Sequence, residues 1–246
     1  MTAAPQALIA EVTHRCPLHC VYCSNPEQMQ SAVHELSTED WTKIIEQAAE
    51  IGCWHLHLTG GEPLLRRDAE QLVLAGQKSG LYVNLITSGL GLTRERLGAL
   101  VEAGLDHIQL SFQDSEEAEA NTIAGTRAHA KKLQLAEWIR AHRIAFTVNL
   151  VIHRRNIDRL EELIRFAEGL KADKLEIANV QLLRLGAKKS SGSSAVPRTA
   201  SGVTPGNRIG PSTAVWQDAY RLRFTRLLRE VSEALHGRLG PRVDAD

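Results

Sequence analysis

Short apolar runs alternate with amphipathic stretches along the first three quarters of this chain. Six runs rich in apolar and β-branched residues predict strands at 8–13, 55–59, 82–87, 107–112, 146–152 and 174–181. Between them, apolar residues at helical spacing predict helices at about 38–51, 67–79, 93–103, 128–140 and 158–169. Strands that alternate with helices favour parallel βαβ units with right-handed crossovers. The pattern therefore predicts an α/β fold, a partial (β/α)6 barrel that is open like an incomplete TIM barrel.

Two of the predicted helices have a residue suited to begin them. Ser37 precedes the first helix and places Asp40 at its third position, so we expect Ser37 to be the N-cap. Gly52 is expected to end that helix. Asp158 is expected to cap the helix that runs to about Gly169.

Residues able to carry chemistry gather where the predicted strands end. In barrels of this type the active site lies at the carboxyl ends of the strands. The residues at or just past those ends are Cys16 to Cys23, Gly60 to Pro63, Ser88, Gln113 and Asn179. We therefore expect one functional edge.

The composition narrows the function classes. The chain has 246 residues and a formal charge of zero, so nothing argues for nucleic acid as a partner. No apolar run is long enough to span a bilayer, and the amino terminus lacks the charged and apolar regions of a signal peptide. We expect a cytoplasmic protein with reduced thiols.

Three of the four cysteines, Cys16, Cys20 and Cys23, lie within eight positions. Three thiolates are one too few for a closed zinc site, whereas a [4Fe–4S] cluster held by three leaves one iron open to another ligand. A buried or disulfide-bonded trio is the alternative. The isolated Cys53 is expected to be a core thiol.

The C-x3-C-x2-C spacing with Tyr22 before the last cysteine resembles the cluster loop of radical S-adenosylmethionine (SAM) enzymes. The resemblance implies that Cys16, Cys20 and Cys23 bind a [4Fe–4S] cluster. It also implies that Gly60, Gly61 and Glu62 hold the methionyl end of SAM, with Pro63 fixing the turn. Candidates for contacts to the SAM ribose or carboxylate are Ser111, Gln113 and Asn149. An ordinary strand-end cap is the alternative for each of these three.

Longer segments narrow the resemblance to the PqqE family of pyrroloquinoline quinone biosynthesis. They include RCPLHCVYCSNP, YVNLITSGLGL, GLDHIQLSFQDS and NLVIHRRNIDRLEE. The resemblance covers about residues 7–181. It implies a radical SAM oxidoreductase that joins a glutamate and a tyrosine of the precursor peptide PqqA by a carbon–carbon bond. The implied partners are PqqA, the peptide chaperone PqqD and an electron donor such as flavodoxin. Alternatives are another radical SAM peptide-modifying enzyme and a catalytically idle barrel that only binds peptide or chaperone.

The chain changes character after Gln181. We expect a core barrel at 1–181, a low-complexity linker at 182–213 and an amphipathic helix at 214–246. Basic and acidic residues number 18 and 24 up to Gln181, but 11 and 5 beyond it. No cysteine follows Cys53, so we expect the auxiliary clusters of the family, and with them full crosslinking, to be missing. Because the residues after Gln181 fit a shifted translation of Tyr-Tyr-Gly-Trp-Ala, we expect a shifted reading frame from Leu182 onward.

Overall fold

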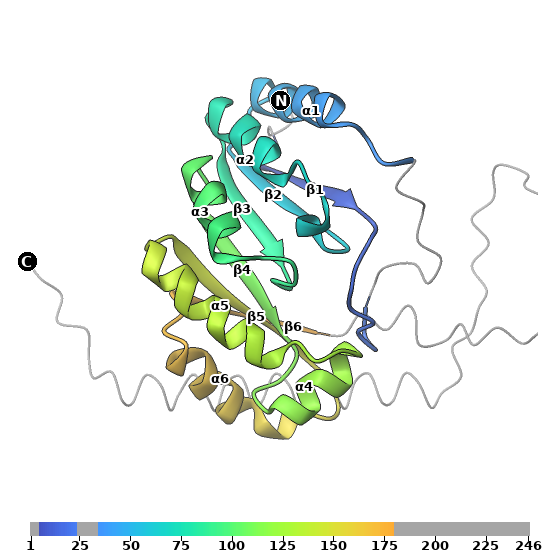
Figure 1. Ribbon diagram of the computed structural model, residues 1–246, viewed down its shortest axis with the longest axis vertical. Coiled ribbons are helices and arrows are strands. Elements are labelled where there is room, and N and C mark those ends of the chain that lie inside the picture. Colours follow the sequence, from blue (N-terminus) through green and yellow to red (C-terminus); the bar gives the residue numbers. More distant parts are fainter. Residues whose placement is uncertain (1–4, 24–33, 180–246) are drawn as a thin grey trace, which may run out of the picture. The chain divides into compact units, whose positions relative to one another are not determined.

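The computed structural model describes residues 5–23 and 34–179, which form a six-stranded sheet with helices between the strands (Figure 1). The strands are parallel and lie in the order β1-β2-β3-β4-β5-β6, so each strand pairs with its neighbours in the sequence. The predicted open α/β sheet is confirmed. All carboxyl ends of the strands therefore lie at the same edge.

The elements agree with the sequence pattern to within a few residues. The strands are β1 (Ala7–Thr13), β2 (His55–Gly60), β3 (Tyr82–Thr87), β4 (His107–Phe112), β5 (Ala145–Ile152) and β6 (Lys174–Asn179). The helices are α1 (Thr38–Glu50), α2 (Ala69–Lys78), α3 (Arg94–Glu102), α4 (Glu117–Ala124), α5 (His129–His142) and α6 (Leu160–Gly169). Short 3₁₀ turns lie at η2 (Pro63–Leu65) and η3 (Ile157–Arg159).

The two faces of the sheet differ in chemistry because strand residues alternate between them. In β2, Leu56 and Leu58 are buried, and Leu56 meets helix α2. His55 and His57 lie on the opposite, open face, where their rings stack at 5.9 Å. There Nδ1 of His57 lies 3.0 Å from Nδ2 of Asn84 on β3. The apolar core thus lies between sheet and helices, and the open face is lined with polar side chains.

Helix α1 begins as the sequence predicts. The Ser37 hydroxyl accepts a hydrogen bond from the Asp40 amide at 3.1 Å, and the Asp40 carboxylate accepts one from the Ser37 amide. This reciprocal capping box satisfies amide groups that the first turn would otherwise leave unpaired. Ile51 is the C-cap, and Gly52 follows with a φ of 98°. The end of the helix is confirmed as well.

The prediction that Asp158 caps the last helix is wrong. Residues 157–159 form η3, and α6 begins at Leu160 with Arg159 at the N-cap position. The side chain of Asn156 shapes this turn, because it accepts from the His153 amide at 2.8 Å and donates to the Val151 carbonyl at 3.1 Å.

Helix α4 was not predicted, because its eight residues carry only three buried apolar side chains, Ala120, Ile123 and Ala124. Strand β6 ends at Asn179 within the described residues, so the predicted extension to Gln181 lies outside them. The expected linker at 182–213 and helix at 214–246 lie outside them too. Across 5–23 and 34–179, none of the helices combines the length and the apolar character needed to cross a membrane.

Candidate functional site

A cavity of about 310 Å³ opens at the carboxyl ends of the strands. It brings together eight of the ten residues that the resemblance assigns to cluster or SAM binding: Cys16, Cys20, Cys23, Gly60, Gly61, Ser111, Gln113 and Asn149. Tyr22, Thr87, Ser88 and Phe112 also line it. Two predicted residues, Glu62 and Pro63, do not line the cavity.

The cysteine loop, residues 16–23, packs on helix α4. The His19 amide donates to the Ala124 carbonyl at 2.9 Å, and the Val21 amide donates to the Ile123 carbonyl at 3.2 Å. Leu18 packs between Ala124 and Ala128, with Cys16 and Cys20 against the same small cluster. The helix that sequence reasoning missed is therefore the support of the loop.

The thiols of the loop lie in a partly dehydrated place. Burial raises the pKa of Cys16, and it raises the pKa of Cys20 to about 11, while the positive charge of Lys132 opposes both shifts. No disulfide joins the four cysteines, all of which lie in the described part of the chain. Cys53 is buried in the core as predicted.

The chemistry of the loop thiols suits an iron–sulfur cluster, whose irons are held by cysteine thiolates. Within residues 5–23 and 34–179, no three His, Cys, Asp or Glu side chains are placed to hold a single metal ion. A [4Fe–4S] cluster takes each thiolate on a different iron, so its ligands stand farther apart than those of one ion. Cys16, Cys20 and Cys23 line one cavity that has room beside them, and this arrangement fits such a cluster.

The glycine pair at the end of β2 is required because the backbone of residues 13–15 lies directly against it. A Cβ on Gly60 would lie 2.3 Å from the Thr13 carbonyl oxygen, and Gly60 has a φ of 138°. A Cβ on Gly61 would lie 2.3 Å from the carbonyl oxygen of Arg15. The Gly61 amide donates to the Thr13 carbonyl at 2.6 Å, and the Glu62 amide donates to the Arg15 carbonyl at 2.7 Å. The glycines thus let the base of the cysteine loop approach β2, and they also form part of the cavity wall.

Glu62 is completely buried and joins β2 to the end of β3. Its carboxylate accepts hydrogen bonds from the amides of Leu64 and Ser88 at 3.1 and 2.8 Å, and from the hydroxyls of Thr87 and Ser88. Burial raises its pKa, and these four donors oppose the rise. Pro63 follows as the first residue of η2, where its fixed φ suits the turn. Glu62 does not line the cavity, but its hydrogen bonds fix the backbone next to Gly60, Gly61 and Ser88, which do.

Lys132 is a site residue that sequence reasoning missed. It is 1% exposed, and its Nζ donates to the Ser111 carbonyl and to Oε1 of Gln113, both at 2.7 Å. Burial lowers its pKa to about 8. The signal was present in the sequence, since Lys132 falls on the helix face of Ala128, Leu135 and Ile139, where a lysine is unusual.

Tyr22 lies at the rim of the cavity. Its ring centroid lies 5.8 Å from that of His153, which follows β5. Burial raises the pKa of the Tyr22 phenol, and the side chain of Gln113 opposes that rise. The aromatic residue of the cysteine loop thus meets the ends of β4 and β5.

Known proteins resemble this chain in sequence and in fold. The Radical SAM superfamily model matches residues 10–167. A PqqA peptide cyclase of Bradyrhizobium diazoefficiens is 42% identical over 236 residues, which are 96% of this chain and 57% of that protein. Its namesake in Methylocella silvestris is 51% identical over 178 residues, 72% of this chain and 48% of that protein. The chain thus spans about half the length of the curated relatives it matches.

Solved structures share the fold. Streptococcus suis SuiB, in a crystal structure bound to the precursor peptide SuiA, superposes with a TM-score of 0.64 at 21% identity. The match covers 72% of this chain and 40% of SuiB. A second structure shows SuiB bound to S-adenosylmethionine, also with a TM-score of 0.64.

Proposed function

We propose that this chain, which belongs to the radical SAM superfamily, holds its cofactors in the cavity at the strand ends. The cofactors of the superfamily are a [4Fe–4S] cluster and S-adenosylmethionine. One observation carries the proposal. Three thiols, two glycines and the polar ends of β4 and β5 line the same cavity, although they come from segments far apart in the sequence.

Cys16, Cys20 and Cys23 are the proposed iron ligands. Thiolates bind iron, so metal uptake must release the protons of these thiols. Because burial raises the pKa of Cys16 and Cys20, cluster assembly is expected to become easier as pH rises. When bound, the reduced cluster and SAM supply a 5′-deoxyadenosyl radical that can abstract a hydrogen atom from a substrate.

The remaining site residues are proposed to bind SAM. Gly60 and Gly61 present backbone groups to its methionyl end, while Glu62 and Pro63 hold that backbone in place. Ser111, Gln113 and Asn149 line the wall where the ribose or the carboxylate would lie. Lys132 adds a buried positive charge behind Ser111 and Gln113, which favours an anionic group in front of them.

The proposed substrate is a precursor peptide. Relatives at 42% to 51% identity are named PqqA peptide cyclases, and SuiB is a peptide-bound protein of the same fold. From the sequence resemblance, the proposed peptide is PqqA, with PqqD presenting it and a donor such as flavodoxin supplying electrons. The reaction would be the Glu–Tyr carbon–carbon crosslink.

The proposed binding of a cluster and SAM is tested by anaerobic reconstitution with iron and sulfide, followed by incubation with SAM and a reductant. The proposal predicts bound iron and 5′-deoxyadenosine in amounts that depend on the protein. Iron uptake without SAM cleavage would favour the idle barrel that only binds peptide or chaperone.

Mass spectrometry of PqqA tests the proposed crosslink, after incubation with this chain, PqqD, SAM and reductant. Crosslinking removes two hydrogen atoms, the first by abstraction and the second as a proton and an electron that must reach an acceptor. The proposed reaction predicts a peptide lighter by two hydrogen atoms, with an iron–sulfur cluster as the electron acceptor. A peptide of unchanged mass in a mixture that cleaves SAM would contradict the crosslink as the reaction of this chain.

A further inference from the structure

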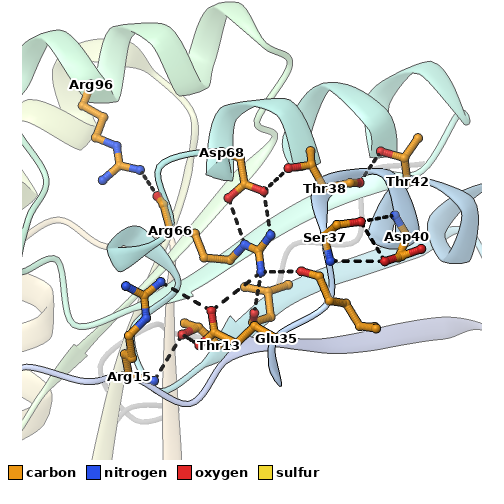
Figure 2. A network of polar contacts seen from close by, with 12 residues as sticks. Thr13, Arg15, Glu35, Ser37, Thr38, Asp40, Thr42, Arg66, Asp68 and Arg96 are labelled. Atoms are coloured by element: carbon orange, nitrogen blue, oxygen red, sulfur yellow. Dashed lines mark hydrogen bonds and ion pairs between the residues drawn. The ribbon is translucent and has the colours of Figure 1, made fainter. Parts of the chain in front are cut away.

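A buried arginine beside the glycine turn joins three segments of the chain: its own and two that are distant in the sequence. Arg66 is 6% exposed, and its Nε and Nη2 donate to the two carboxylate oxygens of Asp68 at 2.9 and 2.6 Å. Its Nη1 donates to the carbonyl of Val12 at 3.1 Å and to the carbonyl of Leu36 at 3.0 Å. Figure 2 shows the guanidinium at the centre of this network.

Two of these segments, here called the two flanks, lie before and after the cysteine loop in the sequence. Residues 12–15 directly precede the loop, and residues 34–37 follow it after ten residues that lie outside the described part. Val12 belongs to the first flank and Leu36 to the second, so one side chain bridges them. A second link runs beside it: the Thr13 hydroxyl donates to Glu35, whose carboxylate lies 3.4 Å from Arg15 and 4.0 Å from Arg66.

The charges of the network favour ionised partners. Burial works to raise the pKa of Asp68, yet the Arg66 guanidinium and the Thr38 hydroxyl hold it below its ordinary value. Burial has the same tendency at Glu35, where the Thr13 hydroxyl and Arg15 lower the pKa. Both carboxylates therefore stay charged at neutral pH and hold the arginine between them.

We infer that Arg66 is the positioning residue of the cysteine loop. Arg66 ties the two flanks to the turn that follows Gly60–Pro63. The position of the chain that leads into Cys16 is therefore set by the folded protein before any cofactor binds. The inference rests on the proposed function for its importance to iron, and on the hydrogen bonds above for its geometry.

Only arginine can make this set of contacts. Its planar fork presents two parallel donors to a carboxylate and further donors to the side, whereas a lysine offers three donors from one point. Arg66→Lys keeps the charge but cannot bind Asp68 with two parallel bonds and also reach both carbonyls. The backbone of Arg66 is itself held by Arg96, whose Nη2 donates to the Arg66 carbonyl at 2.6 Å.

The test compares Arg66→Lys with two other variants of the whole chain. Leu163→Ala removes a buried side chain of α6, which connects β5 and β6 at the other end of the sheet from β1. It should lower the stability of the protein without changing either flank. Thr13→Val removes only the hydroxyl between Glu35 and the Arg15 amide, so it serves if Arg66→Lys fails to fold.

Two readouts are measured. The first is amide hydrogen exchange of Gly61 and Glu62 in the metal-free protein, corrected for global stability, because these amides donate to the Thr13 and Arg15 carbonyls. The second is the rate at which reconstituted protein loses iron to a chelator. We expect faster exchange at both amides in Arg66→Lys, and iron loss about tenfold faster than in the wild type. Leu163→Ala should match the wild type in both.

Unchanged exchange at these amides in Arg66→Lys and Thr13→Val would overturn the inference, whatever happens to iron. Faster exchange with unchanged iron loss would overturn it as well. If the wild type takes up no iron, the proposed function fails, and the exchange measurement alone decides the role of Arg66.

Discussion

The Nζ atom of Lys132 lies 2.7 Å from Oε1 of Gln113, so helix α5, none of whose residues line the cavity, supports the cavity wall with a buried charge. Desolvation makes that charge costly and lowers the pKa of Lys132 to about 8, from an ordinary value of 10.5. Lys132 is thus the group whose ionisation should be visible in the stability of the metal-free protein.

Lys132→Met is expected to remove part of the pH dependence of unfolding. Between about pH 8 and 10.5 the unfolded chain holds more protons at Lys132 than the folded chain does. The free energy of unfolding of the wild type should therefore rise with pH across this window, by up to about 3 kcal/mol relative to the variant. Urea denaturation at several pH values measures the difference. Parallel curves would show that the folded lysine titrates normally.

Gly61→Ala and Gly98→Ala should have opposite effects. A Cβ at Gly61 meets the carbonyl oxygens of Arg15 and His14 at 2.3 and 2.6 Å, so the substitution should cost about 1–3 kcal/mol. Gly98 lies within α3 with nothing within 4 Å of an added Cβ, so alanine there should stabilise by about 0.5–1 kcal/mol. Chemical denaturation of both variants checks the signs. Equal effects would mean that the loop base can move away from β2.

Glu62→Ala is expected to weaken SAM binding more than cluster assembly. The substitution leaves the amides of Leu64 and Ser88 without their acceptor, at a cost of about 1–3 kcal/mol, and loosens the turn that carries Gly60 and Gly61. The thiols are on another segment. Titration of SAM into the reduced protein, followed by EPR, reports the affinity, and iron analysis reports the assembly. An unchanged SAM affinity would rule out this role for Glu62.

The strands could be predicted from local alternation in the sequence, and the position of the cavity follows from the parallel order of those strands. Alternation located β2, and the fixed geometry of parallel strands then placed Gly60 and Cys16 at one edge. Sequence reasoning missed α4, whose apolar pattern is weak and whose last residues accept hydrogen bonds from the cysteine loop. It could not anticipate the Arg66 network, since the partners of a buried arginine come from segments about 30 and 54 positions away.

The role of the glycines shows the same limit. The sequence resemblance implies that Gly60 and Gly61 hold the methionyl end of SAM, and the structure shows that the backbone of Thr13 and Arg15 already lies against them. A sequence motif can indicate that a position must be glycine. It does not show which neighbouring atoms exclude a larger side chain.

The gene sequence around the Gln181 codon tests whether the residues from Leu182 onward come from a shifted reading frame. A shifted frame from Leu182 predicts that removing one base restores Tyr-Tyr-Gly-Trp and, later, a cysteine-rich segment. Sequencing of genomic DNA across this codon decides the matter. If neither alternative frame encodes those residues, the composition after Gln181 belongs to a native segment.

The central claim is that Cys16, Cys20 and Cys23 bind a cluster that cleaves SAM, whereas Cys53 does not take part. Cys20→Ala and Cys53→Ala form a matched pair, since the first thiol lines the cavity and the second is buried in the core. The decisive measurement is iron per chain, together with 5′-deoxyadenosine formed, after anaerobic reconstitution of the wild type and both variants. The account predicts that the wild type and Cys53→Ala load iron and cleave SAM, and that Cys20→Ala does neither. Normal iron loading and SAM cleavage in Cys20→Ala, or their loss in Cys53→Ala, would contradict it.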